Sequence, residues 1–417
     1  MSKDNDGFYD YKKEWSVVKD KLLSCYLPAY FQKLLSTRHP ICYIDCFAGK
    51  GMFDDGAEGS PIIALKIRKE CLARSRMDIK VIDTCFIDLK YAKELENNIK
   101  IQMLDGPHVY VYTGKFEEGV PILLNNVINY WDKHHITPNI FLYIDPFGIK
   151  QLNSNLLTNF GTYHFNTFEM LINFNSFGLF RNACKAMNVS YEQDEVLMDT
   201  SDVDDQEEEK ITPGQKAIDF VNSIAGDDYW MQIVIDYKTK KINGYEAEKQ
   251  LSLGYKKFLS RSYKYVLDMP IRLKEGQRPK YRMVHVSNNE HGCVAMADDM
   301  AKRSSELVIE IQHKDEPQQI NLFSSFDVEN EPCDDAFIGK CIIQCLSDFR
   351  GIKFPLKQLK ASFYMEYGVL CKDSVLNRVL KSLSKNGIIV LETYDLHTGS
   401  FIQINTISDK GTTARLK

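Results

Sequence analysis

The 417-residue chain has no long apolar run. Nowhere do eighteen apolar residues follow one another, which excludes a transmembrane helix. The opening segment, Met1 to Asp6, is polar and has no apolar core, so we expect no secretory signal. No Cys-x-x-Cys spacing occurs among the eleven cysteines, which argues against a structural zinc site and favours buried thiols in a reducing compartment. We therefore expect a cytoplasmic protein with no membrane partner and no metal site.

The excess of acidic residues is confined to one segment. The net charge is -5, but the stretch Glu192 to Glu209 holds ten carboxylates and no Lys or Arg. Without that stretch the rest of the chain is mildly basic, and Lys256 to Arg282 is its most basic part, with nine basic and two acidic residues. A basic surface is compatible with a polyanionic partner, although solvated charges alone would also explain it.

Short apolar strands alternate with helical segments from residue 41 onward. Strands are expected at 41–46, 81–87, 109–112, 140–144 and 168–174. Because they are apolar throughout, they predict a parallel sheet covered on both faces. The predicted fold class is therefore α/β, with a doubly wound, mostly parallel Rossmann-like sheet. Arg282 to Ser287 and Glu306 to Ile311 could add an antiparallel pair to this sheet.

The same patterns predict the domain organisation. Residues 1–40 are expected to be helical, with a break at Pro28, and residues 41–312 to form the Rossmann-like domain. That domain would contain an acidic disordered insertion at 190–211 and a helical insertion at 213–269. Residues 313–335 read as a linker. Three helices and a hairpin in 336–417 indicate a winged-helix domain.

The predicted strands end on aspartates that core packing does not explain. Asp45, Asp88 and Asp145 each follow such a strand, and the carboxyl ends of parallel strands form the ligand-binding edge of an open sheet. After Asp45 the chain reads Phe47-Ala48-Gly49-x-Gly51, a sharp turn whose glycines leave room for a ligand. It is neither a P-loop nor the dinucleotide fingerprint. A glycine turn without a ligand remains the alternative.

The fourth strand ends on Asp145-Pro146-Phe147-Gly148. Proline donates no N–H, so this turn offers oxygen acceptors beside an aromatic ring. Such a set suits the exocyclic amino group of a planar base, which could stack on the ring. These four residues are the candidate catalytic residues.

Together these motifs resemble class I S-adenosylmethionine-dependent methyltransferases, and more narrowly the three-Cys-motif partner (TcmP) family. The resemblance covers roughly residues 10 to 310 and also rests on Tyr26-Leu27, Gly59-Ser60-Pro61 and Arg282 to Gly292. It implies S-adenosylmethionine as cofactor and a three-Cys-motif protein as a possible partner. It also implies a cofactor site made of Asp45, Phe47, Ala48, Gly49, Gly51, Asp88, Lys115 and Phe116. The methyl acceptor would then lie at residues 145–148. The family pattern has a second proline where this chain has Phe147.

The last helix of the predicted winged helix carries a row of basic residues. Its candidate nucleic-acid-binding residues are Lys372, Asn377, Arg378, Lys381 and Lys385. In a helix-turn-helix variant this face would enter the major groove. Winged helices also dock proteins, and that alternative stays open.

Three functions are compatible with these patterns. The leading hypothesis is methyl transfer to an amino group of a nucleic-acid base. A second is a magnesium-dependent nuclease that uses the strand-end aspartates. The third is a non-catalytic binding module with a vestigial cofactor pocket.

Overall fold

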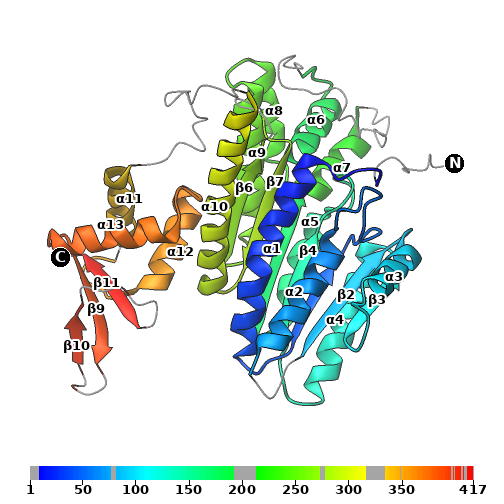
Figure 1. Ribbon diagram of the computed structural model, residues 1–417. Helices are drawn as coiled ribbons and strands as arrows, with labels where there is room; N and C mark the ends of the chain where they lie inside the picture. Colours follow the sequence, from blue (N-terminus) through cyan, green and yellow to red (C-terminus); the bar gives the residue numbers. More distant parts are fainter. Residues whose placement is uncertain are drawn as a thin grey trace. The chain divides into compact units, whose positions relative to one another are not determined.

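The computed structural model describes residues 9–76, 81–191, 213–272, 278–315, 334–347, 349–395, 398, 400–404, 407 and 411–416. The chain divides into two compact units, whose elements are labelled in Figure 1. The first comprises residues 1–264 and 270–288, and the second residues 265–269 and 289–417. The expected acidic insertion lies almost entirely outside the described residues, as does the expected linker after residue 315.

A seven-stranded, mostly parallel sheet confirms the expected α/β class. Its strands lie in the order β3-β2-β1-β4-β5-β7-β6. The bounds are β1 (Ile41–Asp45), β2 (Ile82–Asp88), β3 (Val109–Thr113), β4 (Asn139–Ile144), β5 (Thr167–Phe174), β6 (Tyr265–Ile271) and β7 (Tyr281–Ser287). The pairs from β3 to β5 are parallel, whereas β7 is antiparallel to β5. The order reverses between β1 and β4, which is where doubly wound sheets bind ligands.

Helices cover both faces of this sheet. In front of it in Figure 1, α1 (Glu14–Leu35) packs beside α2 (Ser60–Arg74). On that face the rings of Tyr43 and Phe86 are in contact. The next side chain, Ile87, must therefore point to the opposite face. There it lies 3.4 Å from the position of a Cβ on Gly119, in α4 (Phe116–Asp132). Strands β1, β2, β4 and β5 are thus buried from both sides, as expected. The expectation is wrong for β3, which lies at the edge of the sheet and is largely exposed.

Helix α1 corrects one expectation. It runs without interruption from Glu14 to Leu35 and contains Pro28, where we expected a break. A proline removes one backbone hydrogen bond inside a helix, but burial of the flanking side chains compensates here. Leu27 and Phe31 are fully buried, so the helix is held against the sheet by packing on both sides of the proline.

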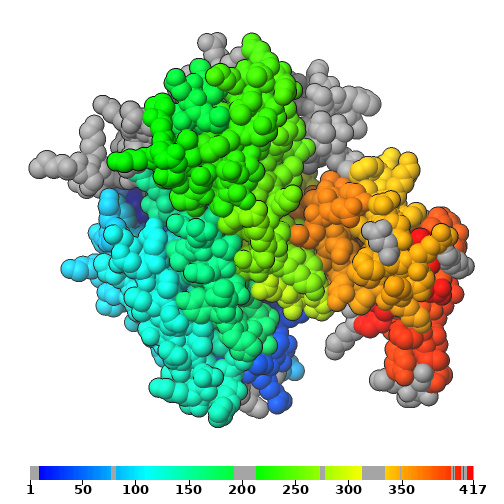
Figure 2. All heavy atoms as spheres, turned by 180° about the vertical axis from the view of Figure 1, so that it is seen from behind, coloured from blue at the N-terminus to red at the C-terminus, as the bar shows by residue number. Residues whose placement is uncertain are grey.

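The remaining helices of the first unit are α3 (Ala92–Ile101), α5 (Ser154–Asn159), α6 (Ser176–Ala186), α7 (Gln215–Ala225), α8 (Trp230–Lys238) and α9 (Gly244–Leu259). Helices α6 to α9 contact one another and gather at the top of Figure 1. Their green atoms form the top of this unit from behind as well (Figure 2). The expected helical insertion is therefore present. Its predicted end at residue 269 is wrong, because β6 already begins at residue 265.

The second unit combines helices with a small sheet. Its helices are α10 (Glu290–Asp315), α11 (Asp335–Ser347), α12 (Leu356–Tyr367) and α13 (Asp373–Lys385). Its sheet has the order β10-β9-β11-β8, with bounds β8 (Phe354–Pro355), β9 (Ile389–Asp395), β10 (Ser400–Gln403) and β11 (Thr412–Leu416). Two of these strands, β8 and β11, were not expected. The expected strand at 306–311 is wrong, because this stretch lies inside α10.

Candidate active site

The loop after β1 is folded tightly against the end of β2. Its backbone N–H groups at Ala48 and Gly49 donate to Ile87 O (3.0 Å) and to the Asp88 carboxylate (2.9 Å). Gly49 and Gly51 have φ angles of 60° and 76°, which favour glycine. The sequence-predicted residues 45–51 and Asp88 are therefore brought together.

Asp88 acts as the anchor of this edge. Besides Gly49, its carboxylate accepts hydrogen bonds from the backbone N–H groups of Lys90 (2.8 Å) and Tyr91 (2.7 Å). The side chain therefore fixes the start of the segment that leads into α3, and it is 9% exposed. A hydrogen-bonded carboxylate that still reaches the surface can accept a hydroxyl of a bound sugar.

Tyr9 fills the space that the glycine turn leaves open. Its hydroxyl oxygen overlaps the position that a Cβ on Gly49 would take, and its ring packs edge-on against Tyr91. Its carbonyl accepts a hydrogen bond from Asp54 N (2.8 Å). Burial, with a further contribution from Asp88, raises the pKa of the Tyr9 hydroxyl far above its usual value. In this structure the room left by Gly49 is thus occupied by the chain itself.

Asp45 is a fully buried carboxylate. Ser60 Oγ donates to it at 2.6 Å and Phe47 N at 3.3 Å. Burial raises its pKa to about 7, although these two hydrogen bonds act in the opposite direction. Asp45 therefore links the β1 loop to the first residue of α2, and it titrates near neutrality.

Asp145 is held by an ion pair that the sequence did not predict. Lys19 Nζ, from α1, lies 2.8 and 2.7 Å from its two carboxylate oxygens. Asn173 Nδ2, at the end of β5, donates to Oδ1 at 2.7 Å. The Lys19 side chain is 8% exposed and that of Asp145 is 22% exposed. The expected acceptor carboxylate is therefore already neutralised by a buried cation.

The three residues after Asp145 differ in exposure. Pro146 is buried, whereas the Phe147 side chain is 42% exposed. Gly148 has a φ of 94° and no described atom within 4 Å of an added Cβ. The turn therefore presents an aromatic ring at the surface, two residues after Asp145.

Lys115 and Phe116 lie at the start of α4. The Phe116 ring is 2% exposed and packs on Phe47 at a centroid distance of 5.2 Å. It therefore belongs to the β1 loop cluster. The Lys115 side chain is exposed and lies 3.6 Å from Glu118. No contact among the described residues joins it to Asp45 or Asp88.

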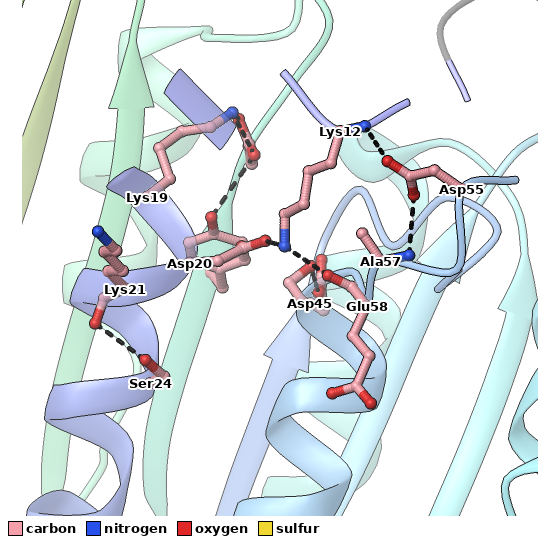
Figure 3. A network of polar contacts seen from close by, with 12 residues as sticks. Lys12, Lys19, Asp20, Lys21, Ser24, Asp45, Asp55, Ala57 and Glu58 are labelled. Carbon is pink, nitrogen blue, oxygen red and sulfur yellow. Dashed lines mark hydrogen bonds and ion pairs between the residues drawn. The ribbon is translucent and has the colours of Figure 1, made fainter. Parts of the chain in front are cut away.

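A second lysine and carboxylate extend this network along α1 (Figure 3). Lys12 Nζ lies 2.5 Å from Asp20 Oδ2 and 2.5 Å from the carbonyl oxygen of Glu58. Burial raises the pKa of Asp20 to about 6, against the lowering effect of Lys12. Lys12, Lys19, Asp20 and Asn173 were all missed from the sequence, because each lies outside the motifs at the ends of β1 and β4 along the chain.

The strand-end aspartates do not form a metal site in this structure. Asp45 is bound by Ser60, Asp88 by backbone N–H groups and Asp145 by Lys19. Among the described residues, no group of three or more His, Cys, Asp or Glu is placed to hold a metal ion.

The predicted nucleic-acid face on α13 is only partly available. The Arg378 guanidinium donates to both carboxylate oxygens of Asp335, at 2.9 and 2.7 Å. Asn377 donates to Asp373 at 3.0 Å. Lys372 is half-buried at the N-cap, while Lys381 and Lys385 are exposed. Of the five predicted residues, Lys381 and Lys385 are thus exposed cations that make no ion pair with the described residues.

The basic stretch 256–282 is also less available than its composition suggests. Arg282 makes a buried, bidentate ion pair with Glu248, with both nitrogens at 2.7 Å. Arg261 lies 2.6 Å from Asp227.

No helix in the described part of the chain is long and apolar enough to cross a membrane. When the chain is compared with protein-family models and with curated proteins, nothing matches it.

Proposed function

We propose that the protein is a class I S-adenosylmethionine-dependent methyltransferase of the three-Cys-motif partner type, acting on an amino group of a nucleic-acid base. The observation that carries this proposal is the convergence of the Gly49 turn, Asp88 and the Asp145–Phe147 turn at one edge of the sheet. This edge is the switch point between β1 and β4, where doubly wound folds bind ligands.

The residues present fit the cofactor once Tyr9 is displaced. Asp88 would accept the ribose hydroxyls, the Gly49–Gly51 turn would lie against the methionine part, and the Phe47–Phe116 pair would border the adenine. Bound S-adenosylmethionine supplies an electrophilic methyl group on a sulfonium centre. The chain's own contribution is to hold the acceptor in line and to exclude water. The exposed ring of Phe147 would stack on the acceptor base.

The alternatives receive less support. A magnesium-dependent nuclease needs carboxylates that face one ion, and here each strand-end aspartate is engaged with different partners. If no cofactor binds, a non-catalytic binding module is the remaining hypothesis.

The described cysteines are free thiols, and this supports a cytoplasmic location. A three-Cys-motif protein is the partner that the resemblance implies.

Cofactor binding tests the proposal directly. Isothermal titration with S-adenosylhomocysteine should show one site per chain, and Asp88→Ala should weaken it at least tenfold. Asp83→Ala is the matched control, because Asp83 lies on the same strand but contacts His108 instead. Thermal melting establishes that both variants fold. Absence of binding to the wild-type chain would overturn the proposal.

A further inference from the structure

The oxygen acceptors of Asp145 are already in use. Oδ1 accepts from Lys19 Nζ (2.8 Å) and Asn173 Nδ2 (2.7 Å), and Oδ2 accepts from Lys19 Nζ (2.7 Å). Tyr143 OH lies a further 3.5 Å from Oδ2. A carboxylate that is paired with a buried ammonium and an amide attracts a further N–H donor weakly, because its charge is compensated. Asp145 is therefore a poor primary acceptor for an incoming amino group.

Asn173 holds the acceptor that remains. The residue is 3% exposed, and no described group donates to its side-chain oxygen Oδ1. Its orientation is fixed, because turning the amide over would place Oδ1 against the Asp145 carboxylate. A buried, unsatisfied acceptor destabilises a fold, so a donor from a ligand would stabilise this edge. Oδ1 is closed to solvent in this structure, so a ligand reaches it only when the side chains that cover it move.

The register of the strands places Asn173 beside the expected acceptor position. Ile144 pairs with Ile172, so Asp145 and Asn173 are neighbours one residue further on. Both therefore lie on the α1 face of the sheet, where Lys19 contacts Asp145. The exposed ring of Phe147 follows two residues after Asp145.

We propose that Asn173 Oδ1 recognises the exocyclic amino group of the acceptor base, with Asp145 and Lys19 as positioning residues that orient its amide. This deepens the proposed function and rests on it for the identity of the site. The amide oxygen accepts an N–H and repels a carbonyl oxygen. The site should therefore select adenine over hypoxanthine and cytosine over uracil, pairs in which a carbonyl replaces the amino group. A site built around a hydrogen bond rejects the analogue that cannot form it.

The test uses the full-length protein saturated with S-adenosylhomocysteine. Adenosine, inosine, cytidine and uridine 5′-monophosphates are titrated separately by calorimetry. We expect the amino-bearing member of at least one pair to bind at least tenfold more tightly than its carbonyl analogue. Asn173→Ala should reduce this preference to less than threefold without changing the affinity for S-adenosylhomocysteine.

Asn166→Ala is the matched control. Asn166 precedes β5 at its opposite end and donates to Asn139, so its removal should leave the preference intact. The proposal is overturned if the wild-type chain binds both members of each pair equally or binds none of them. It is also overturned if the preference survives in Asn173→Ala. These outcomes are separate from the cofactor test, because the same nucleotides are also titrated into the chain without S-adenosylhomocysteine. A nucleotide preference that depends on Asn173 in a chain that does not bind S-adenosylhomocysteine would overturn the proposed function but not the role of Asn173.

Discussion

At the scale of single residues, the environment of Asp45 predicts a pH dependence of stability. Burial raises its folded-state pKa from 3.8 to about 7, so the folded chain retains a proton that the unfolded chain has lost between these values. The free energy of unfolding therefore falls as pH rises from about 4 to 7 and stays constant above pH 7. The contribution is at most about 4 kcal/mol, and Asp20 acts with the same sign.

Asp45→Asn should remove this contribution. At pH 8 the Asp45 carboxylate is charged, whereas the asparagine amide is neutral. Ser60 Oγ can accept a hydrogen bond from the amide NH₂ instead of donating one. We expect a higher melting temperature than wild type at pH 8 and a smaller difference between pH 5 and pH 8. Asp55→Asn is the control of opposite sign, because backbone N–H groups of Ala57 and Lys12 lower the pKa of that exposed carboxylate. An unchanged pH profile would show that Asp45 ionises normally.

The position of Tyr9 leads to a prediction about affinity. Its side chain occupies the space beside Gly49, so a ligand at the turn must first displace a buried ring. Tyr9→Ala should bind S-adenosylhomocysteine about tenfold more tightly than wild type, because this displacement is no longer needed. Calorimetry measures the change. Tyr11→Ala, an exposed neighbour, is the control, and weaker binding by Tyr9→Ala would mean that the ring packs on the ligand.

Residues within one motif could be predicted from the sequence, but contacts between distant segments could not. Asp45, Gly49 and Gly51 follow one strand directly, so their proximity is local. Lys19 and Asp145 are 126 positions apart, and the sequence does not show that α1 brings a lysine to the end of β4. Tyr9 was missed for the same reason.

At the scale of elements, apolar runs predicted strands well where turns bounded them. Strands β1 to β5 lie where expected because each apolar run ends at a turn. All of them except the edge strand β3 are buried on both faces. The strand predicted at Glu306 to Ile311 is wrong, because its apolar residues fit a helix equally well. It continues a helix that starts at Glu290, and length decides between the two.

Helix α13 gives a prediction about salt dependence. If it contacts nucleic acid, Lys381 and Lys385 are the cations that reach phosphates, since they are exposed one turn apart. Binding of the full chain to a single-stranded 20-mer oligonucleotide should weaken steeply with salt. Replacing both lysines with Ala should flatten the log–log slope by between 1 and 2.

Arg378→Ala is the comparison variant for α13. The Arg378 guanidinium is already paired with Asp335, so this substitution should change the log–log salt slope by less than one. Fluorescence anisotropy at several salt concentrations measures both. If the double lysine variant binds with the wild-type slope, the helix face does not contact phosphate and a protein-docking role is favoured.

At the scale of the whole molecule, the second unit begins earlier in the sequence than expected. It includes α10, which contacts α12 and whose Asp298 accepts from Asp373 N at 2.8 Å. A fragment of residues 335–417 lacks this helix. We expect it to melt several degrees below a fragment of residues 290–417, since each lost kcal/mol lowers Tm by about 4–8 °C in domains of this size. Circular dichroism measures both, and equal melting temperatures would show that α10 is dispensable.

The place of β7 in the sheet also has a consequence for synthesis of the chain. β5 is complete at residue 174, but its neighbour β7 begins at residue 281. Ribosomes add about 5–20 residues per second, so the edge of β5 waits roughly 5 to 20 s for its partner. Its buried residues Met170, Ile172 and Phe174 belong to a strand that is unpaired on one side during this time. Unpaired edges invite aggregation, so the interval before β7 emerges is when the nascent chain most needs protection.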